Sequence, residues 1–148
     1  MNRITFTSVQ DEKDLRLLKK FLLKQPQFYP NHKDWIDGKC VPGIENGFYN
    51  NIIALVEGII VGETVYRFLE NNEIEIKNFR IDPDYRNRDI GHFLLKQIEA
   101  DYKDKKLILD VTTINFSGVE FFIRNGFKIV DAKELYKNGQ LEYLMEKV

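Results

Sequence analysis

The sequence has few of the residues that build disulfide frameworks and metal clusters. It holds one cysteine, Cys40, and two histidines in 148 residues. A single cysteine excludes an intramolecular disulfide framework and fits a reducing cytosol. His32 and Cys40 have no partners at the spacing of a zinc site or of a cysteine–histidine nucleophile. We therefore expect neither a metal nor cysteine-based catalysis.

An excess of charge of one sign is also missing, because 22 basic residues nearly balance 23 acidic ones. Without a basic stripe, we expect no nucleic acid and no anionic membrane surface as a partner. The sequence has no apolar run long enough to span a bilayer, no signal peptide and no internal repeat. These absences predict a soluble, cytoplasmic protein, and the length predicts one domain over residues 1–148.

Hydrophobic patterning predicts how the first half of the chain is organised. Alternation predicts a strand over 3–8, and an apolar stripe predicts a helix from Ser8 or Asp11 to about Lys24. A short helix over 30–37 and a loop over 38–47 should follow. The pairs Glu57-Gly58 and Asn71-Asn72 are hairpin signals, so three antiparallel strands are expected at 51–56, 59–68 and 73–81.

The second half alternates helices with strands. A helix from Gly91 to about Tyr102 precedes a buried strand at 107–111, which should therefore run parallel to the strand at 73–81. A helix over 117–125 and a strand from 127 follow. Asn138-Gly139 predicts a final hairpin, with Leu141, Tyr143 and Met145 facing inward.

The strand at 73–81 changes the face on which its apolar residues lie. Ile74 and Ile76 are even-numbered, whereas Phe79 and Ile81 are odd-numbered. A regular strand cannot place all four on one face, so either both faces are buried or an extra residue is inserted near 77–78. We favour a bulge.

The segment 85–91 joins this strand to the next helix and carries two arginines. The first turn of a helix leaves backbone N–H groups unpaired, and the helix dipole makes that end mildly positive. Such a turn is suited to an anion, most plausibly a phosphate. The alternative is a basic surface turn with no ligand.

Two sequence motifs resemble those of the GNAT (Gcn5-related N-acetyltransferase) superfamily. The run P-D-Y-R-N-R-D-I-G-H-F-L-L resembles its pyrophosphate-binding motif, in which Arg86 matches the first position and Gly91 the last, while Asp89 replaces the usual middle glycine. The run N-F-S-G-V-E-F-F-I-R-N-G-F resembles its C-terminal motif. There, Gly118 replaces a small alanine, and Phe122 replaces the tyrosine that commonly protonates the departing thiolate.

The resemblance implies an α/β fold and a cofactor. The expected sheet is mixed and mostly antiparallel, with six or seven strands, two central parallel strands that splay apart, and helices on both faces. The implied cofactor is acetyl-CoA, used as a co-substrate, and no metal is implied. The residues implied to bind it are Phe79, Ile81, Arg86, Asn87, Arg88, Asp89, Ile90, Gly91, His92 and Asn115.

A glutamate is the candidate base. Attack on a thioester requires a neutral amine, and an alkylammonium ion, with a pKa near 10.4, is rarely neutral at pH 7. By the resemblance, Glu75 occupies the position of the glutamate base in the histone-modifying branch of the superfamily. Glu73 and Glu63 are weaker candidates.

The segment from 25 to 47 is a candidate substrate rim. It contains three of the four prolines and several rings, and its candidate residues are Phe28, Tyr29, His32, Trp35 and Cys40. Aromatic residues in a connecting segment also commonly close the edge of a core, and that interpretation stays open for each of them.

The sequence thus predicts an N-acetyltransferase that transfers acetyl from acetyl-CoA to a primary amine by direct attack in a ternary complex. The acceptor is expected to be a small molecule or a peptide, and a homodimer is left open. The alternative is a non-catalytic acyl-CoA-binding module, such as a sensor or partner subunit, which Asp89 and Phe122 support.

Overall fold

The computed structural model describes residues 3–25 and 28–148. Four strands belong to the first part of the sheet: β1 (Ile4–Thr7), β2 (Asn50–Val56), β3 (Ile59–Phe68) and β4 (Glu73–Ile81). Three more are β5 (Lys106–Thr112), β6 (Lys128–Lys133) and β7 (Glu142–Lys147). The helices are α1 (Glu12–Lys24), α2 (His32–Trp35), η1 (Ile36–Cys40), α3 (Val41–Glu45), η2 (Pro83–Tyr85), α4 (Ile90–Asp101) and α5 (Phe116–Arg124).

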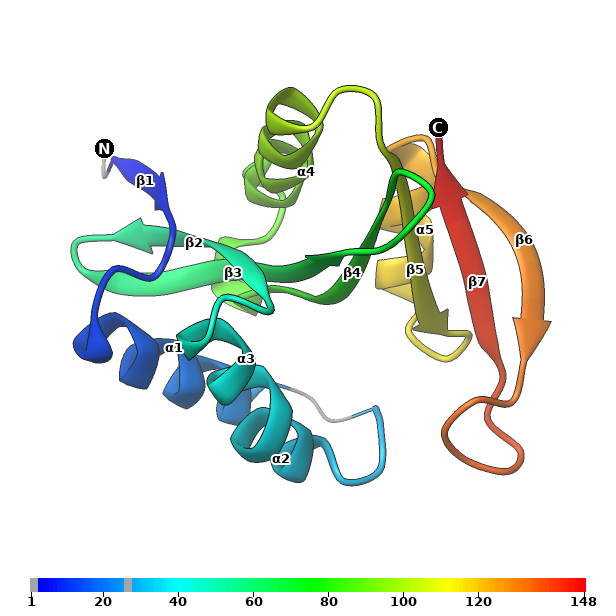
Figure 1. Ribbon diagram of the computed structural model, residues 1–148, viewed down its shortest axis with the longest axis horizontal. Helices are drawn as coiled ribbons and strands as arrows, with labels where there is room; N and C mark the ends of the chain where they lie inside the picture. The colour runs from blue at the N-terminus through cyan, green and yellow to red at the C-terminus, as the bar shows by residue number, and fades with distance from the viewer. Residues whose placement is uncertain (1–2, 26–27) are drawn as a thin grey trace.

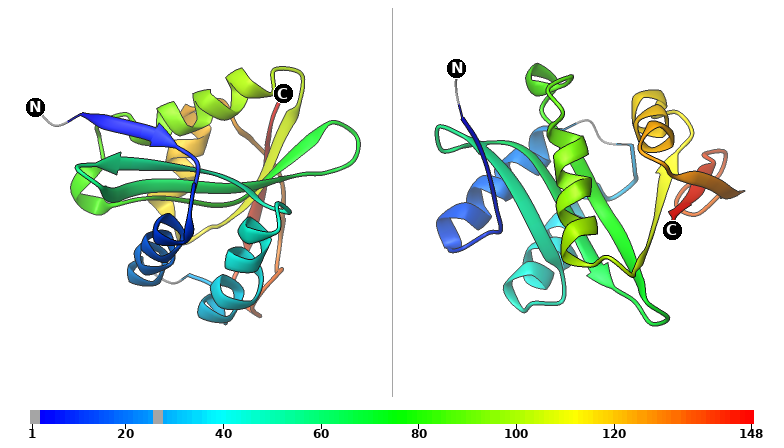
Figure 2. Two further views of the ribbon diagram at one scale, coloured as in Figure 1. Left: turned by 60° about the vertical axis from the view of Figure 1, so that its left-hand side comes forward. Right: turned by 90° about the horizontal axis from the view of Figure 1, so that it is seen from above.

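The described strands form one mixed sheet of seven, in the order β1-β2-β3-β4-β5-β7-β6. Its central pair, β4 and β5, is parallel, and the other neighbouring pairs are antiparallel. Helices α1, α2 and α3 lie on one side of the sheet and α4 on the other (Figure 1). Figure 2 shows α5 beside β5. The fold class predicted from the sequence is confirmed.

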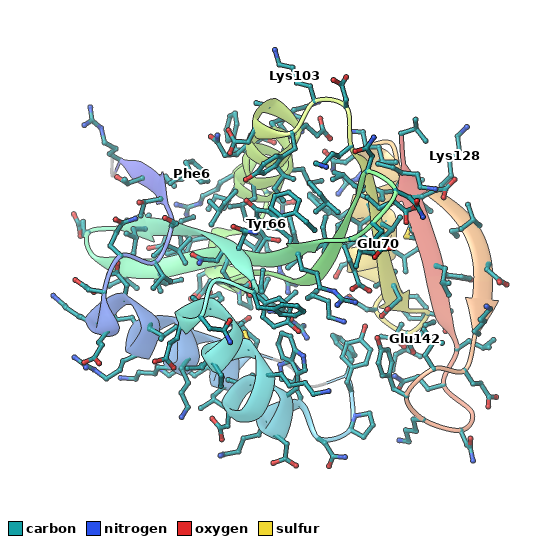
Figure 3. The ribbon with its side chains drawn as sticks, in the orientation of Figure 1. Phe6, Tyr66, Glu70, Lys103, Lys128 and Glu142 are labelled. Atoms are coloured by element: carbon teal, nitrogen blue, oxygen red, sulfur yellow. The ribbon has the colours of Figure 1, made fainter. Side chains whose placement is uncertain are left out.

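Two clusters of buried side chains in the described residues hold these layers together. One packs α4 and α5 against the sheet and includes Ile74, Ile76, Leu94 and Phe122. The other packs α1 and η1 against the opposite face of β2 and β3. Tyr66 lies in the first cluster, at the middle of the sheet below α4 (Figure 3).

Local sequence signals place several of these elements. The side chain of Asp11 accepts a hydrogen bond from the backbone N–H of Asp14 and caps α1. Of the two predicted starts of this helix, Ser8 and Asp11, the second is therefore confirmed. Glu57 and Gly58 have positive φ angles of 51° and 78°, as do Asn71 and Asn72 at 64° and 60°. These are the left-handed conformations that two-residue hairpins need, and both hairpins are confirmed.

The predicted bulge in β4 is confirmed. Val65 pairs with Asn78, but the next residue, Tyr66, pairs with Ile76, so Lys77 is the inserted residue. Beyond it the sheet opens, because β4 and β5 pair at residues 73–75 and 106–108 and the described ladder ends there. The bulge therefore marks where the parallel strands separate.

The predicted loop over 38–47 is wrong, because η1 and α3 continue α2 as one run of helix to Glu45. The backbone N–H of Val41 bonds to the carbonyl of Ile36, a wider i→i+5 turn. This turn precedes Pro42, which then lies in the first turn of α3, where its missing N–H is tolerated. Glycine and proline suggested a loop, but the π turn accommodates them.

The final hairpin is confirmed, with a turn at Asn138 and Gly139 where the backbone N–H of Gln140 bonds to the carbonyl of Lys137, but its connection is longer than predicted. The connection from β6 to β7 spans residues 134–141 rather than only Asn138 and Gly139. Leu141 is exposed, whereas Met145 is buried as expected and Tyr143 packs against the core. The residue that turns inward at the start of β7 is Glu142, which interacts with Tyr29 (Figure 3). Gln140 Nε2 donates hydrogen bonds to both that carboxylate and the carbonyl of Phe28.

Candidate active site

The separation of β4 from β5 leaves a narrow cleft in the sheet. A cavity of about 60 Å³ follows it, lined by the β4 segment from Ile76 to Arg80, by the β5 segment from Leu109 to Val111, and by Phe122 of α5. Backbone groups on facing edges of β4 and β5 are not paired with each other beyond residue 75 in the described structure. An elongated ligand with amide groups could hydrogen-bond to both edges.

The loop predicted to hold a phosphate lies between η2 and the N-terminus of α4. Asn87 and Asp89 adopt left-handed φ angles of 63° and 61°, and the Asp89 side chain makes no capping hydrogen bond. The Arg88 guanidinium lies 5.0 Å from the ring centroid of Tyr85. The N–H groups that begin a helix lack partners within it, so this loop combines backbone donors with two exposed arginines, of which Arg86 is the other.

Other residues predicted for the cofactor have side chains that serve the packing. Ile90 is buried in the core, and a Cβ added to Gly91 would lie 2.8 Å from the Phe121 ring. His92 Nδ1 lies 3.0 Å from Asn125 Oδ1. Ile90 and Gly91 could meet a ligand only through their backbone, and Gly91 is needed first for the close approach of α4 to α5.

Phe79, Ile81 and Asn115 complete the predicted set. Phe79 lines the cleft, with its ring centroid 5.4 Å from that of Phe122, and Ile81 packs against the core. Asn115 lines the cleft and caps α5, since its Oδ1 accepts from the backbone N–H of Gly118 at 3.1 Å. A Cβ on Gly118 would lie 2.5 Å from Asn115 Nδ2, so this glycine makes room for the cap.

A second and larger cavity opens beside the cleft, on the side of α2 and α3. It has a volume of about 940 Å³ and is bounded by residues 29–31, by α2, η1 and α3, and by the sheet. The residues that line both cavities are Tyr29, Lys77, Asn78 and Asp110. The bulge of β4 and the middle of β5 therefore form the junction between them.

Four of the five predicted rim residues line one or both cavities. Tyr29, His32 and Trp35 line the large one, and Phe28 lines the cleft. Burial lowers the pKa of His32 to about 4, so its ring, stacked on Trp35, is neutral at pH 7. Cys40 lines neither cavity, and burial raises the pKa of its thiol to about 12, which leaves it unreactive.

The three predicted glutamates have different surroundings. Glu75 Oε1 accepts a hydrogen bond from Arg67 Nε at 2.7 Å and lies 3.8 Å from Lys77 Nζ, and Glu75 lines neither cavity. Glu73 forms an ion pair with Lys106 at the paired end of β4. Glu63 is fully buried, accepts a hydrogen bond from Asn78 Nδ2, and has a pKa raised to about 7 by burial.

Sequence reasoning missed a carboxylate at the junction. Asp110 lies in β5, and both its oxygens are within hydrogen-bonding distance of the Tyr136 hydroxyl, at 3.0 and 2.9 Å. Burial raises the pKa of Asp110. One signal was available, because Asp110 interrupts a short strand that is otherwise apolar. Tyr136 comes from the 134–141 connection, and no sequence pattern links it to β5.

Tyr29 is the tyrosine among the described residues that lines both cavities. Its hydroxyl accepts a hydrogen bond from the backbone N–H of Thr112 at 3.3 Å, and its ring packs edge-on against Tyr136 at a centroid distance of 5.0 Å. Burial raises the pKa of this phenol, so the hydroxyl keeps its proton at neutral pH. Phe122, by contrast, has no polar atom to offer the cleft.

Within residues 3–25 and 28–148, no group of three or more histidine, cysteine, aspartate or glutamate side chains is arranged to hold a metal ion. No helix in that part of the chain is both long and apolar enough to cross a bilayer.

Comparison with known proteins supplies the family. The model of the acetyltransferase (GNAT) family matches residues 10–127. The chain therefore belongs to the GNAT family of acetyltransferases, as its motifs predicted, and shares the family's fold. Members of this family are described as acetyltransferases. Two solved structures with the same fold contain coenzyme A and acetyl-CoA, respectively.

Individual relatives are identical to this chain at 30% of the aligned residues or fewer. Spermidine N(1)-acetyltransferase of Thermoplasma acidophilum is 30% identical over 105 residues, which cover 66% of this chain and 62% of that protein. A putative GNAT acetyltransferase of Desulfovibrio desulfuricans superposes with a TM-score of 0.84 at 16% identity, covering 97% of this chain and 98% of its own. PaiA N-acetyltransferase of T. acidophilum, solved in complex with coenzyme A, gives 0.76 at 22% identity, with 98% of both chains covered. These structures show that the fold is shared.

Proposed function

We propose that this protein is an acetyl-CoA-dependent N-acetyltransferase that transfers acetyl directly to a primary amine in a ternary complex. The observation that supports this most is the meeting of two cavities at Tyr29, Lys77, Asn78 and Asp110. A narrow cleft for an elongated cofactor and a wide cavity for an acceptor share one junction. Holding two reactants at one junction contributes to the rate by itself.

The residues present fit coenzyme A. The arm of the cofactor would lie in the cleft between the bulge of β4 and β5, with Asn115 beside it. Its pyrophosphate would lie at the backbone N–H groups that start α4, near Arg86 and Arg88. A protein with the same fold was solved in complex with coenzyme A, which supports coenzyme A as the ligand. Bound there, the cofactor supplies an acetyl thioester, whose carbonyl carbon is the electrophile.

Asp110 is the carboxylate that the geometry favours as the base. The amine nitrogen forms a bond to the acetyl carbon, the carbon–sulfur bond breaks, and the proton lost by the amine passes to the carboxylate. Asp110 lines both cavities, and a positioned base typically contributes about 10²- to 10⁴-fold. Glu75, the base predicted from sequence, would act through a water, because its side chain is paired with Arg67 and lines neither cavity.

Tyr29 is our proposed proton donor for the departing thiolate. The family tyrosine is replaced by Phe122, whereas the Tyr29 hydroxyl enters the junction from a different segment. Burial raises its pKa, so the hydroxyl is protonated at neutral pH. The products are then an N-acetylamine and free coenzyme A.

A ligand scan and a transfer assay test this function together. Acetyl-CoA and coenzyme A should raise the melting temperature and ATP should not, since a ligand at 100 times its Kd adds about 2.7 kcal/mol to the free energy of unfolding. An amine panel with thiol detection should then yield an N-acetyl product by mass spectrometry. Stabilisation by acetyl-CoA without product from any amine would favour the non-catalytic acyl-CoA-binding module instead.

A further inference from the structure

The charges around the large cavity bear on which amine it accepts. Its lining carries three basic side chains, Lys39, Arg67 and Lys77, against two acidic ones, Asp34 and Asp110. A cavity that binds a polycation, such as a polyamine, requires an excess of negative charge in its lining. The lining of this cavity has no such excess. The similarity to a spermidine acetyltransferase is therefore not matched by the charge balance of this cavity.

Arg67 is the basic residue best placed to bind an anion. Only its Nε is engaged by a described acceptor, Glu75 Oε1 at 2.7 Å. The two terminal nitrogens of a guanidinium carry four further N–H donors in a fork that matches a carboxylate. Lys77 Nζ lies 3.8 Å from the same Glu75 oxygen, so two cations share one carboxylate and leave an excess of positive charge.

Asp110 and the Arg67–Lys77 pair thus present opposite charges to one cavity. Arg67 pairs with Glu75 across β3 and β4, and Glu75 pairs with Ile108 across β4 and β5. Arg67 and Ile108 are therefore two strands apart, about 10 Å at the backbone, and Asp110 lies two residues further along β5, beyond the last β4–β5 pair. Lys77 lies on β4, the strand between them, and all three side chains line the same cavity. A small molecule that carries both a positive and a negative group can therefore meet the opposite charge of each there.

We propose that the acceptor is an amino acid, with its amine at Asp110 and its carboxylate at Arg67 and Lys77. This inference rests on the proposed acetyltransferase function and specifies its substrate class. The rings of Trp35, Phe48 and Tyr49 line the same cavity and would pack against an apolar or aromatic side chain of the amino acid.

Matched acceptor pairs that differ by the carboxylate test this proposal. Phenylalanine is compared with phenethylamine, lysine with cadaverine, and spermidine is added as a polycation. We expect kcat/KM to be about 10- to 100-fold higher for the preferred amino acid than for its decarboxylated partner, the range of one charge-assisted hydrogen-bonded pair.

Arg67→Lys is the matched variant, because it keeps the positive charge beside Glu75 and removes the fork. It should raise KM for the amino acid about tenfold and leave kcat/KM for the decarboxylated amine within about twofold. Arg16→Lys, a change at an exposed position of α1 outside both cavities, is the control and should alter neither.

The outcomes separate the acceptor class from the reaction. Preference for decarboxylated amines or for spermidine would overturn the amino-acid class while the acetyltransferase function stands. An equal loss for both members of a pair in Arg67→Lys would also overturn it. If acetyl-CoA stabilises the protein but no amine in the set is acetylated, the amino-acid class fails. If acetyl-CoA does not stabilise the protein either, the proposed function fails as well.

Discussion

Asp89 offers the sharpest probe of where the pyrophosphate binds. It lies at the N-cap of α4 with a left-handed φ of 61°, its side chain is exposed, and it makes no capping hydrogen bond. If the pyrophosphate lies at this helix end, the Asp89 carboxylate repels it. Asp89→Asn removes the charge and keeps a residue that tolerates this backbone, and Asp89→Gly also relieves the backbone constraint.

The expected size follows from the exposure of Asp89. Two unit charges about 4 Å apart in water interact by about 1 kcal/mol, and salt screens this within about 8 Å at physiological ionic strength. Loss of about 1 kcal/mol of repulsion lowers Kd about fivefold, so both variants should bind acetyl-CoA about fivefold more tightly. The free protein should become slightly less stable, because an acidic residue at a helix N-terminus contributes about 0.3–1 kcal/mol.

Titration calorimetry with acetyl-CoA at low and high salt measures this effect, and thermal unfolding measures the stability of the free protein. Asp104→Asn, at an exposed position after α4 and away from its N-terminus, is the control for loss of one negative charge. Affinity that does not increase at low salt in either Asp89 variant would refute the placement of the pyrophosphate at α4.

Further predictions concern the junction, the acceptor cavity and the core. Asp110→Asn should lower kcat at pH 7 more than Glu75→Gln, with both deficits shrinking at high pH, where the amine needs no base; a pH–rate profile of each variant tests this. Tyr29→Phe should lower kcat about tenfold or more without changing the Kd of acetyl-CoA, as measured by steady-state kinetics and calorimetry. Gly38→Leu should raise KM for bulky acceptors and not for small ones, with an unchanged or higher melting temperature, because the position lines the cavity with open space around it. Folding raises the pKa of Glu63 from 4.5 to about 7, so the free energy of unfolding of the wild-type protein should fall by up to about 3 kcal/mol between pH 4.5 and pH 8. Glu63→Gln should not show this fall, and urea unfolding across that pH range compares the two proteins.

Gly91 is a less suitable position than Asp89 for testing the phosphate site. Gly91→Glu would block a phosphate site by adding a side chain and a charge, but any side chain at Gly91 collides with the Phe121 ring. Loss of binding in that variant could then come from displacement of α5. Asp89 is preferable because its side chain is exposed and already outside the packing.

The fold could be predicted largely from local rules. The positive φ angles at Glu57-Gly58 and Asn71-Asn72 are what those residue pairs favour, and the change of parity within β4 has no regular-strand solution except burial of both faces. The helix through Pro42 could not be predicted, because it depends on a π turn for which the sequence gives no distinctive signal.

The sequence pointed to the loop proposed to bind the cofactor and to several rings that line the large cavity, but not to the contacts at the junction of the two cavities. Motifs drew attention to 86–91 and to Asn115 because those residues are adjacent in the chain. The junction instead joins Tyr29 to Thr112 across 83 positions and Tyr136 to Asp110 across 26. Such contacts depend on the tertiary fold, so they cannot be predicted from the hydrophobic periodicity of one segment.

Two-substrate kinetics with isotopically labelled acetyl-CoA test the central claim, direct transfer at the junction of the two cavities, most directly. With a confirmed amine, we predict label in the N-acetyl product, one free thiol released per product, and intersecting double-reciprocal plots that mark a ternary complex. Parallel plots together with label covalently retained on the protein would contradict direct transfer.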